Sequence, residues 1–153
     1  MKKSIFALFL AVAAFAGCTK HERYQIYHPF TDHTWYRFNI LQFEIPVGNE
    51  TDPVNVVFFT RVGKDYPYDS LAFNMVMKTP AGEERVKEYR LRIRDREGKF
   101  TGDFRGDSCE MSMVLKKEIV LGKEGTLTVE LENLVPRLRT TGLYGVGIRL
   151  EAP

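Results

Sequence analysis

The pattern that most restricts the fold is an alternation of apolar and basic side chains in the middle of the chain. Three apolar residues alternate there with three arginines: Tyr89, Arg90, Leu91, Arg92, Ile93 and Arg94. Successive side chains of a β-strand point to opposite faces, so this segment predicts a strand with one buried and one wet face. Such one-sided burial is typical of an antiparallel sheet.

Similar stretches recur along the rest of the chain. The further segments that we expect to be strands are 36–45, 54–61, 71–78, 108–120, 127–131 and 146–150. The apolar phase slips between Ile40 and Leu41, which predicts a β-bulge in one long strand. No stretch keeps a helical period, and we expect at most a short helical turn near Leu134–Leu138. About seven or eight short strands with turns between them predict an all-β fold, an antiparallel β-sandwich of the jelly-roll or immunoglobulin-like type.

The beginning of the chain is typical of a secretory signal. Met1-Lys2-Lys3 is basic, and the twelve residues from Ile5 to Ala16 carry no charge. An apolar run of this length is too short to span a bilayer as a helix, which takes about 20 residues. Small residues precede Cys18, as they do at a cleavage site. We expect residues 1–17 to be a signal peptide that is removed.

Cys18 makes this signal more specific. Phe15-Ala16-Gly17-Cys18 resembles the bacterial lipobox, apart from Phe15, where Leu is commoner. The resemblance implies cleavage between Gly17 and Cys18, a diacylglyceryl group on the Cys18 thiol and an acylated amine. Three lipid chains hold a protein stably at a membrane, whereas one holds it only marginally. An ordinary cleaved signal with a chance cysteine is the alternative. With lipidation, residues 18–33 are expected to be a tether, and residues 34–153 the sandwich domain.

Removal of the signal also changes the charge balance. The chain has 22 basic and 20 acidic residues, and residues 1–17 contain two of the lysines but no acid. The remaining 136 residues therefore hold 20 charges of each sign, and their length fits one domain with a core. This balance argues against a general nucleic-acid-binding protein.

Cys109 is left without a disulfide partner if Cys18 carries lipid. The functional interpretation is a reactive nucleophile or an intermolecular bridge. The alternating pattern, however, places Cys109 on one strand face with Met111, Met113 and Leu115. We therefore favour a small buried side chain.

Five residues form the candidate interaction surface: Tyr66, Tyr68, Arg90, Arg92 and Arg94. The arginines would contact an anionic partner, such as lipid headgroups or a polyanionic glycan. We favour another interpretation, in which the three arginines lie on the solvent-exposed face of a strand and pair with glutamates of the neighbouring strand. The two tyrosines would form an aromatic platform for a sugar or a protein, or would be buried, and the sequence leaves this open. We expect Trp35 in the core.

The sequence does not favour a metal or catalytic site. His21, His28 and His33 fall in the expected tether without neighbouring cysteines or a carboxylate cluster. The acids between Asp95 and Asp107 do not follow the EF-hand order, so we expect a surface loop there. No arrangement of nucleophile and base stands out. We expect no metal, no cofactor and no enzyme.

Six segments of the mature chain follow one another in a distinctive order. They are Tyr24–Phe30 with Trp35, Asn55–Arg61, Asp65–Leu71, Thr79–Gly82, Asp95–Gly102 and Gly142–Glu151. As a set they resemble the gliding-motility lipoprotein family GldH, over nearly all of residues 18–151. The resemblance implies a non-catalytic envelope lipoprotein that supports the gliding machinery, with membrane lipid and envelope proteins as partners. The alternative is a carbohydrate-binding sandwich that serves glycan uptake.

The residues after Cys18 bear on the location. An aspartate directly after the lipidated cysteine would be the usual cue for the inner membrane, and Thr19 stands there instead. The acidic tag of some surface lipoproteins is not evident in Thr19–Arg23. We expect an outer-membrane anchor with the domain facing the periplasm.

Overall fold

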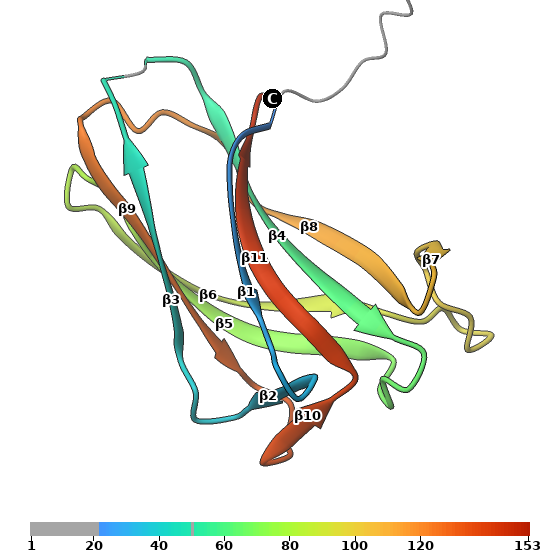
Figure 1. Ribbon diagram of the computed structural model, residues 1–153. Helices are drawn as coiled ribbons and strands as arrows, with labels where there is room; N and C mark the ends of the chain where they lie inside the picture. The colour runs from blue at the N-terminus through green and yellow to red at the C-terminus, as the bar shows by residue number, and fades with distance from the viewer. Residues whose placement is uncertain (1–21, 50) are drawn as a thin grey trace, which may run out of the picture.

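A computed structural model describes residues 22–49 and 51–153, and within them every regular element is a β-strand (Figure 1). The strands are β1 Glu22–Pro29, β2 Thr34–Tyr36, β3 Leu41–Val47, β4 Val54–Gly63, β5 Ser70–Lys78, β6 Glu84–Arg92, β7 Phe104–Arg105, β8 Ser108–Ile119, β9 Gly125–Asn133, β10 Arg139–Thr141 and β11 Leu143–Glu151. The described part of the chain contains no helix long and apolar enough to cross a membrane.

The strands form two main sheets and a small third one. A five-stranded sheet has the order β1-β11-β4-β8-β7, a four-stranded sheet has the order β3-β9-β5-β6, and β10 pairs with β2. Every pair is antiparallel. The expected all-β sandwich is confirmed. The described residues hold eleven strands rather than seven or eight, because β1, β7 and β10 were not expected and the 36–45 segment is divided.

The core lies between the two main sheets, where alternate side chains of each strand meet. Burial alternates strictly along β3, and Leu41, Phe43 and Ile45 point inward. The Phe58 ring of β4 stacks on the Phe73 ring of β5 with their centroids 4.3 Å apart, which joins the two sheets at the centre. Fully buried side chains of this size supply most of the hydrophobic stabilisation of such a domain.

The expected tether of residues 18–33 is wrong in its extent, because β1 lies inside it. β1 pairs with β11 from Glu22 opposite Glu151 to Pro29 opposite Gly145. Its inward side chains Tyr24 and Ile26 pack on the core, and the small number of apolar residues hid the strand from the sequence pattern. The signal peptide and the lipidated Cys18 lie outside the described residues and stay predictions.

The expected long strand at 36–45 is also wrong. β2 and β3 belong to different sheets, and residues 37–40 form a loop between them. The phase slip between Ile40 and Leu41 therefore marks the start of β3 and not a bulge. No helical turn forms at Leu134–Leu138 either; this segment bends so that the N–H of Arg137 bonds to the carbonyl of Val135 at 2.7 Å.

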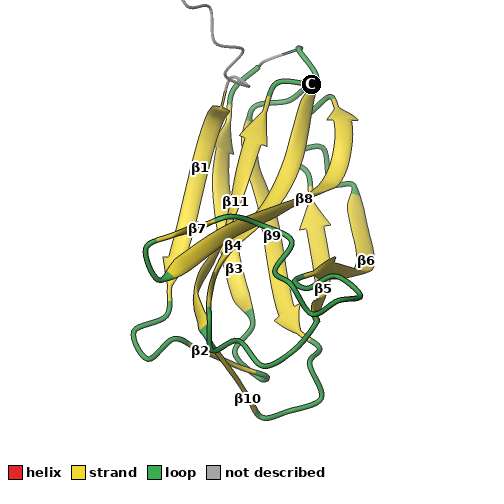
Figure 2. Ribbon diagram, turned by 90° about the vertical axis from the view of Figure 1, so that its right-hand side faces the viewer, coloured by secondary structure: helices red, strands yellow, loops and turns green. Residues whose placement is uncertain are grey.

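The two ends of the sandwich differ. β1 begins and β11 ends at the upper end, whereas β2 and β10 cross the lower end, below the main strands (Figures 1 and 2). β1 is eight residues long, which corresponds to about 27 Å. The chain therefore enters the domain about one strand length away from the β2–β10 pair.

Candidate functional site

Tyr66 does not belong to a surface, which corrects its place in the candidate set. Its side chain is fully buried, and its hydroxyl donates a hydrogen bond to the carbonyl of Ser70 at 2.9 Å. Burial raises the pKa of the Tyr66 hydroxyl. Tyr68 is half-buried, and its ring meets that of Tyr66 edge-on at 5.7 Å. These two tyrosines close the end of the core and do not form an open platform.

Arg94 holds the same loop in place. Its guanidinium donates to the carbonyls of Tyr66 and Tyr68 at 2.7 and 2.9 Å, and lies 4.3 Å from the centroid of the Phe100 ring. Both terminal nitrogens of its guanidinium therefore already donate to carbonyls inside the protein. Arg94 is therefore a clamp on the loop between β4 and β5.

Arg90 and Arg92 remain exposed on β6, the edge strand of the four-stranded sheet. They stand opposite Ala72 and Ser70, and Arg90 donates to the Ser70 hydroxyl at 3.2 Å. The expected pairing with glutamates of the neighbouring strand is wrong: neither arginine forms an ion pair with another described residue. Contact of these two arginines with an anionic partner stays a prediction.

Cys109 and Trp35 are both fully buried, as expected. Burial raises the pKa of the Cys109 thiol, which disfavours the reactive thiolate. The Trp35 ring stacks on Phe30 at 5.9 Å. Cys109 therefore acts as a small core side chain, and Trp35 fills the lower end of the core.

The histidines and the acidic loop are built into the surface. His28 and His33 are exposed, and His33 stacks on Tyr144 at 3.9 Å; His21 lies outside the described residues. A carboxylate oxygen of Asp95 accepts the N–H groups of Glu97 and Lys99 at 2.8 and 2.9 Å, which makes a tight turn. The described residues contain no group of three or more side chains suited to hold a metal ion.

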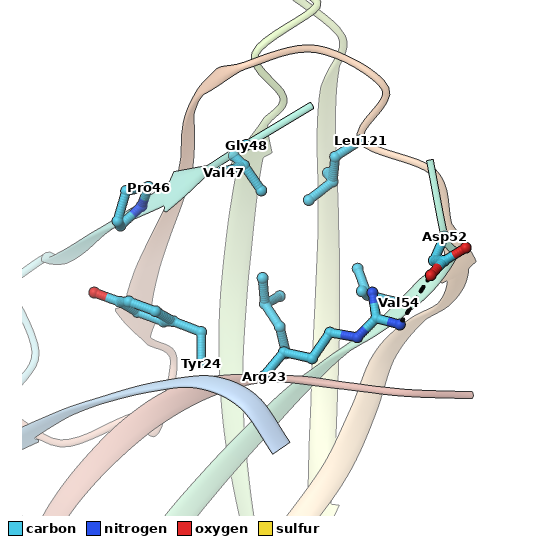
Figure 3. A pocket seen from close by; sticks show the side chains of 9 residues that line it. Arg23, Tyr24, Pro46, Val47, Gly48, Asp52, Val54 and Leu121 are labelled. Atoms are coloured by element: carbon cyan, nitrogen blue, oxygen red, sulfur yellow. Dashed lines mark ion pairs between the residues drawn. The ribbon is translucent and has the colours of Figure 1, made fainter. Parts of the chain in front are cut away.

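A small pocket lies at the upper end, where the chain enters the domain (Figure 3). Tyr24, Val47 and Leu121 line it, and an ion pair of 3.7 Å between Arg23 and Asp52 borders it. Its volume is about 80 Å³. Small-molecule sites usually have about 300–1,000 Å³, so this pocket is too small for a sugar unit to be enclosed.

The sequence did not identify the most unusual surface, which lies at the lower end. Four large apolar side chains are exposed there, with the exposed fractions Phe38 81%, Leu138 69%, Ile40 57% and Tyr36 45%. We call these four residues the apolar tip. They are four of the seven exposed large hydrophobic residues in the described part of the chain. The phase of Phe38 and Ile40, opposite to that of β3, was the only sequence signal.

Hydrogen bonds hold the loop of the apolar tip from both sides. The indole N–H of Trp35 donates to the carbonyl of Asn39 at 3.0 Å, and the N–H of Asn39 donates to the carbonyl of Tyr36 at 3.0 Å. The N–H of Arg37 donates to the carbonyl of Leu138, also at 3.0 Å. The exposed side chains therefore stand on a fixed backbone.

A buried amide fixes the base of the tip. The side-chain nitrogen of Asn133 donates to the carbonyl of Trp35 at 3.1 Å and to the Thr140 hydroxyl at 2.8 Å. Its oxygen accepts the N–H of Val135 at 2.9 Å. Asn133 and Thr140 are fully buried, so one residue of β9 links β2, β10 and the turn between β9 and β10.

A cluster of two aromatic rings and two arginines lies on the outer face of the five-stranded sheet. The rings of Tyr27 and Phe59 stack at 5.7 Å, on either side of Gly147 in β11. The Arg149 guanidinium lies 4.5 Å from the Phe59 ring centroid, and that of Arg61 lies 5.3 Å from Tyr27. We call these four residues the covered cluster, because Phe59 is only 1% exposed although it points away from the core.

Comparison with known proteins identifies the family. The family model of the GldH lipoprotein matches residues 22–150. The chain belongs to the GldH lipoprotein family. A similar protein is the gliding motility lipoprotein GldH of Flavobacterium johnsoniae, 23% identical over 151 residues that cover 94% of this chain and 93% of the relative. No solved structure matches.

Family membership makes the chain a membrane-anchored lipoprotein of the cell envelope. The family match begins at Glu22, the first residue of β1, and it includes both the apolar tip and the covered cluster. The strand that the sequence pattern missed is therefore part of the GldH domain and not a lead-in to it.

Proposed function

We propose that this GldH family member is a non-catalytic structural or assembly component of an envelope complex, of the kind that serves gliding motility. The observation that carries the proposal is the start of β1. Glu22 follows Cys18 by four residues, and the strand that it begins pairs with β11 as far as Pro29. The domain is thus joined to the expected lipid with very little free chain.

The short connection has a mechanical consequence. Four extended residues span at most about 14 Å. A lipid on Cys18 would hold the upper end of the sandwich this close to the bilayer. A protein that captures soluble glycans gains from a long flexible arm, which lets it search a larger volume. A component of a complex gains from a fixed position, and this favours the assembly role over glycan uptake.

The proposed location is the outer membrane with the domain on the periplasmic side, as Thr19 suggests. Protease treatment of intact cells checks the side: the chain should resist digestion until the outer membrane is permeabilised. Digestion in intact cells would place the domain on the cell surface instead.

The decisive experiment lengthens the connection. We expect twenty Gly/Ser residues inserted between Lys20 and His21 to leave the protein in the membrane but to reduce the recovery of its envelope partners in an affinity pull-down. The matched control carries the same insert at Gly98, in the exposed turn after β6. Full recovery of partners with the lengthened connection would contradict the proposal, as would saturable sugar binding in a calorimetric screen.

The Cys18→Ser variant tests the anchor separately. Without the thiol no diacylglyceryl group can be attached, so we expect the chain in the soluble fraction. Mass spectrometry of the N-terminal peptide should show the lipid on Cys18 in the unchanged protein, and an unmodified cysteine would refute the anchor.

A further inference from the structure

We propose that the apolar tip is a docking site for an envelope protein that offers an apolar pocket bordered by carboxylates. This inference rests on the proposed assembly role and names the surface that carries it. Three observations lead to it: the exposure of the apolar side chains, the rigidity of the backbone below them and the charge around them.

The exposed side chains of the apolar tip are large, and they lie on two neighbouring segments. Phe38 and Leu138, at 81% and 69% exposure, are the two most exposed large hydrophobic residues of the described chain, and the segments that carry them are hydrogen-bonded to each other. Burial of a side chain of this kind against a partner is favourable by itself. Aromatic and arginine side chains together are typical of the residues that dominate binding at protein interfaces.

The backbone of the tip is already ordered before any partner binds. The hydrogen bonds of Trp35, Asn39 and the buried Asn133 fix both segments that carry the exposed side chains. A surface that is ordered in advance loses less conformational entropy on binding. A hydrophobic surface of this kind is better suited to a specific partner than a loose loop would be.

Basic residues surround the tip. Segments 31–41 and 134–142 contain three arginines, Arg37, Arg137 and Arg139, and one acid, Asp32. None of the three arginines forms an ion pair with another described residue. The Asp32 carboxylate accepts a hydrogen bond from the Tyr36 hydroxyl at 3.0 Å, inside the tip itself. A complementary partner therefore carries carboxylates around its pocket.

The same features argue against the other occupants. Two copies of the chain would bring six arginines together if they met tip to tip, and like charges at an interface are unfavourable. The anchoring membrane lies at the opposite end, where β1 begins, about one strand length from β2 (Figure 1). An acidic protein surface is the occupant that fits both the charge and the position.

The experiment places a photo-reactive phenylalanine analogue at position 138 of the full-length protein in its own cells. We expect irradiation to yield an adduct with one envelope protein. The adduct should fall about tenfold or more in Phe38→Ser and in the triple reversal Arg37→Glu, Arg137→Glu and Arg139→Glu. Mass spectrometry should map the cross-linked peptide to a region rich in Asp and Glu, and lysines placed there should restore the adduct with the reversed variant.

Two matched controls should leave the adduct unchanged. Val114→Ser removes an exposed apolar side chain elsewhere, on the outer face of the five-stranded sheet. The triple reversal Arg96→Glu, Lys117→Glu and Lys123→Glu makes the same change in net charge at exposed positions away from the tip. Urea unfolding midpoints equal to that of the unchanged protein would confirm that each variant folds.

Three results would overturn the inference: an adduct between two copies of the chain, an adduct that the Phe38 and arginine changes leave intact, or saturable binding of the tip to phosphatidylglycerol vesicles. The proposed function is tested apart from this by the affinity pull-down. If Phe38→Ser still recovers the complex, the docking site is wrong and the assembly role stands. If the unchanged protein recovers no complex, the assembly role itself fails.

Discussion

The covered cluster and the apolar tip both lie outside the core, but their aromatic side chains differ in exposure to solvent. Phe59 on the five-stranded sheet is 1% exposed, whereas Phe38 at the tip is 81% exposed. In the covered cluster, Arg149 and Arg61 lie over the rings of Phe59 and Tyr27. No such contact forms at Phe38 or Tyr36 among the described residues, although three arginines are close in the chain.

The comparison shows that an aromatic ring outside the core can be covered in this fold, as Phe59 is. The exposure of Phe38 is therefore specific to the apolar tip. A glutamate fixes the arginine over Phe59: Glu110 accepts a hydrogen bond from Arg149 at 3.0 Å. The tip holds only Asp32, which is used by Tyr36. No arginine lies over the Phe38 or Tyr36 ring: Arg139 lies beside the Tyr36 hydroxyl instead, and Arg37 and Arg137 form no ion pair with another described residue.

The largest expected effect is that of Phe59→Ala. We expect the free energy of unfolding to fall by about 3–5 kcal/mol, because the ring is buried and its removal leaves a cavity beneath Arg149. Urea unfolding at neutral pH measures this. A loss below about 1 kcal/mol would mean that the covered cluster is not packed like a core, and the contrast with the tip would disappear.

The second effect tests how firmly the tip is held. Asn133→Ala leaves the Val135 N–H and the Trp35 carbonyl without their side-chain partner, and we expect a loss of roughly 2–3 kcal/mol. The amide hydrogen of Asn39 should then exchange faster with solvent than in the unchanged protein. Unchanged exchange would show that the tip does not depend on Asn133 for its order.

The third effect concerns the glycine beneath the covered cluster. A Cβ at position 147 would clash with the Phe59 ring and lie 2.5 Å from the carbonyl oxygen of Ile26, so Gly147→Ala should cost about 1–3 kcal/mol in urea unfolding. Gly48→Ala is the control, because nothing lies within 4 Å of its added Cβ. Equal midpoints for both variants would refute the close packing of Phe59 on β11.

The fourth prediction concerns Tyr27 of the covered cluster and Tyr36 of the apolar tip, whose pKa values are both raised but for different reasons. Burial is the main cause for Tyr27, whereas the hydrogen bond to the Asp32 carboxylate is the main cause for Tyr36. Asp32→Asn should therefore lower the pKa of Tyr36 and leave that of Tyr27 raised. Ultraviolet titration of the single Tyr27→Phe and Tyr36→Phe variants, each with and without Asp32→Asn, assigns the shifts. A lowered Tyr27 pKa would contradict the separation.

The raised pKa of Tyr27 also fixes a pH dependence. Above about pH 10 the unfolded chain ionises before the folded one, so the unfolded state binds fewer protons and stability falls as pH rises. Below that pH the contribution is fully present. Tyr27→Phe should make the decline of the urea midpoint above this pH less steep, and an unchanged slope would contradict the burial of the hydroxyl.

The smallest expected effect on stability is that of Phe38→Ala. The side chain is mostly exposed, so the free energy of unfolding should change by less than about 0.5 kcal/mol, in contrast to the same substitution at Phe59. Parallel urea titrations of the two variants make the comparison directly. A large loss at Phe38 would mean that the tip packs on the domain, and the surface would not be free for a partner.

Prediction from sequence succeeded where the alternation of side chains was dense. β4, β5, β6, β8, β9 and β11 lie where the pattern placed strands, and Trp35 and Cys109 are buried as expected. β1 was missed because few apolar side chains mark its inner face and its outer neighbours on β11 are Gly145 and Gly147. Its pairing joins residues at opposite ends of the chain, and no local pattern reports such a contact.

The candidate site was predicted less well, for a related reason. The sequence left Tyr66 open between a platform and the core, and it placed Arg94 on the wet face of a strand. The fold brings the Arg94 side chain onto the carbonyls of Tyr66 and Tyr68. Phe38 and Ile40 looked like strand residues, but β2 pairs with β10 and turns them outward. In each case, contacts with a segment that is distant in the chain decide whether the side chain is buried or exposed.

The sequence alone determined that this chain is an antiparallel sandwich of the GldH family, because period-two burial and an ordered set of segments are local properties. Only the tertiary structure decided which side chains outside the core are covered. Covering Phe59 takes Tyr27, Glu110 and Arg149 from three different strands. Phe38 is exposed because β2, which precedes it, pairs with β10, a strand that is far away in the sequence. Such contacts are set by packing between distant segments.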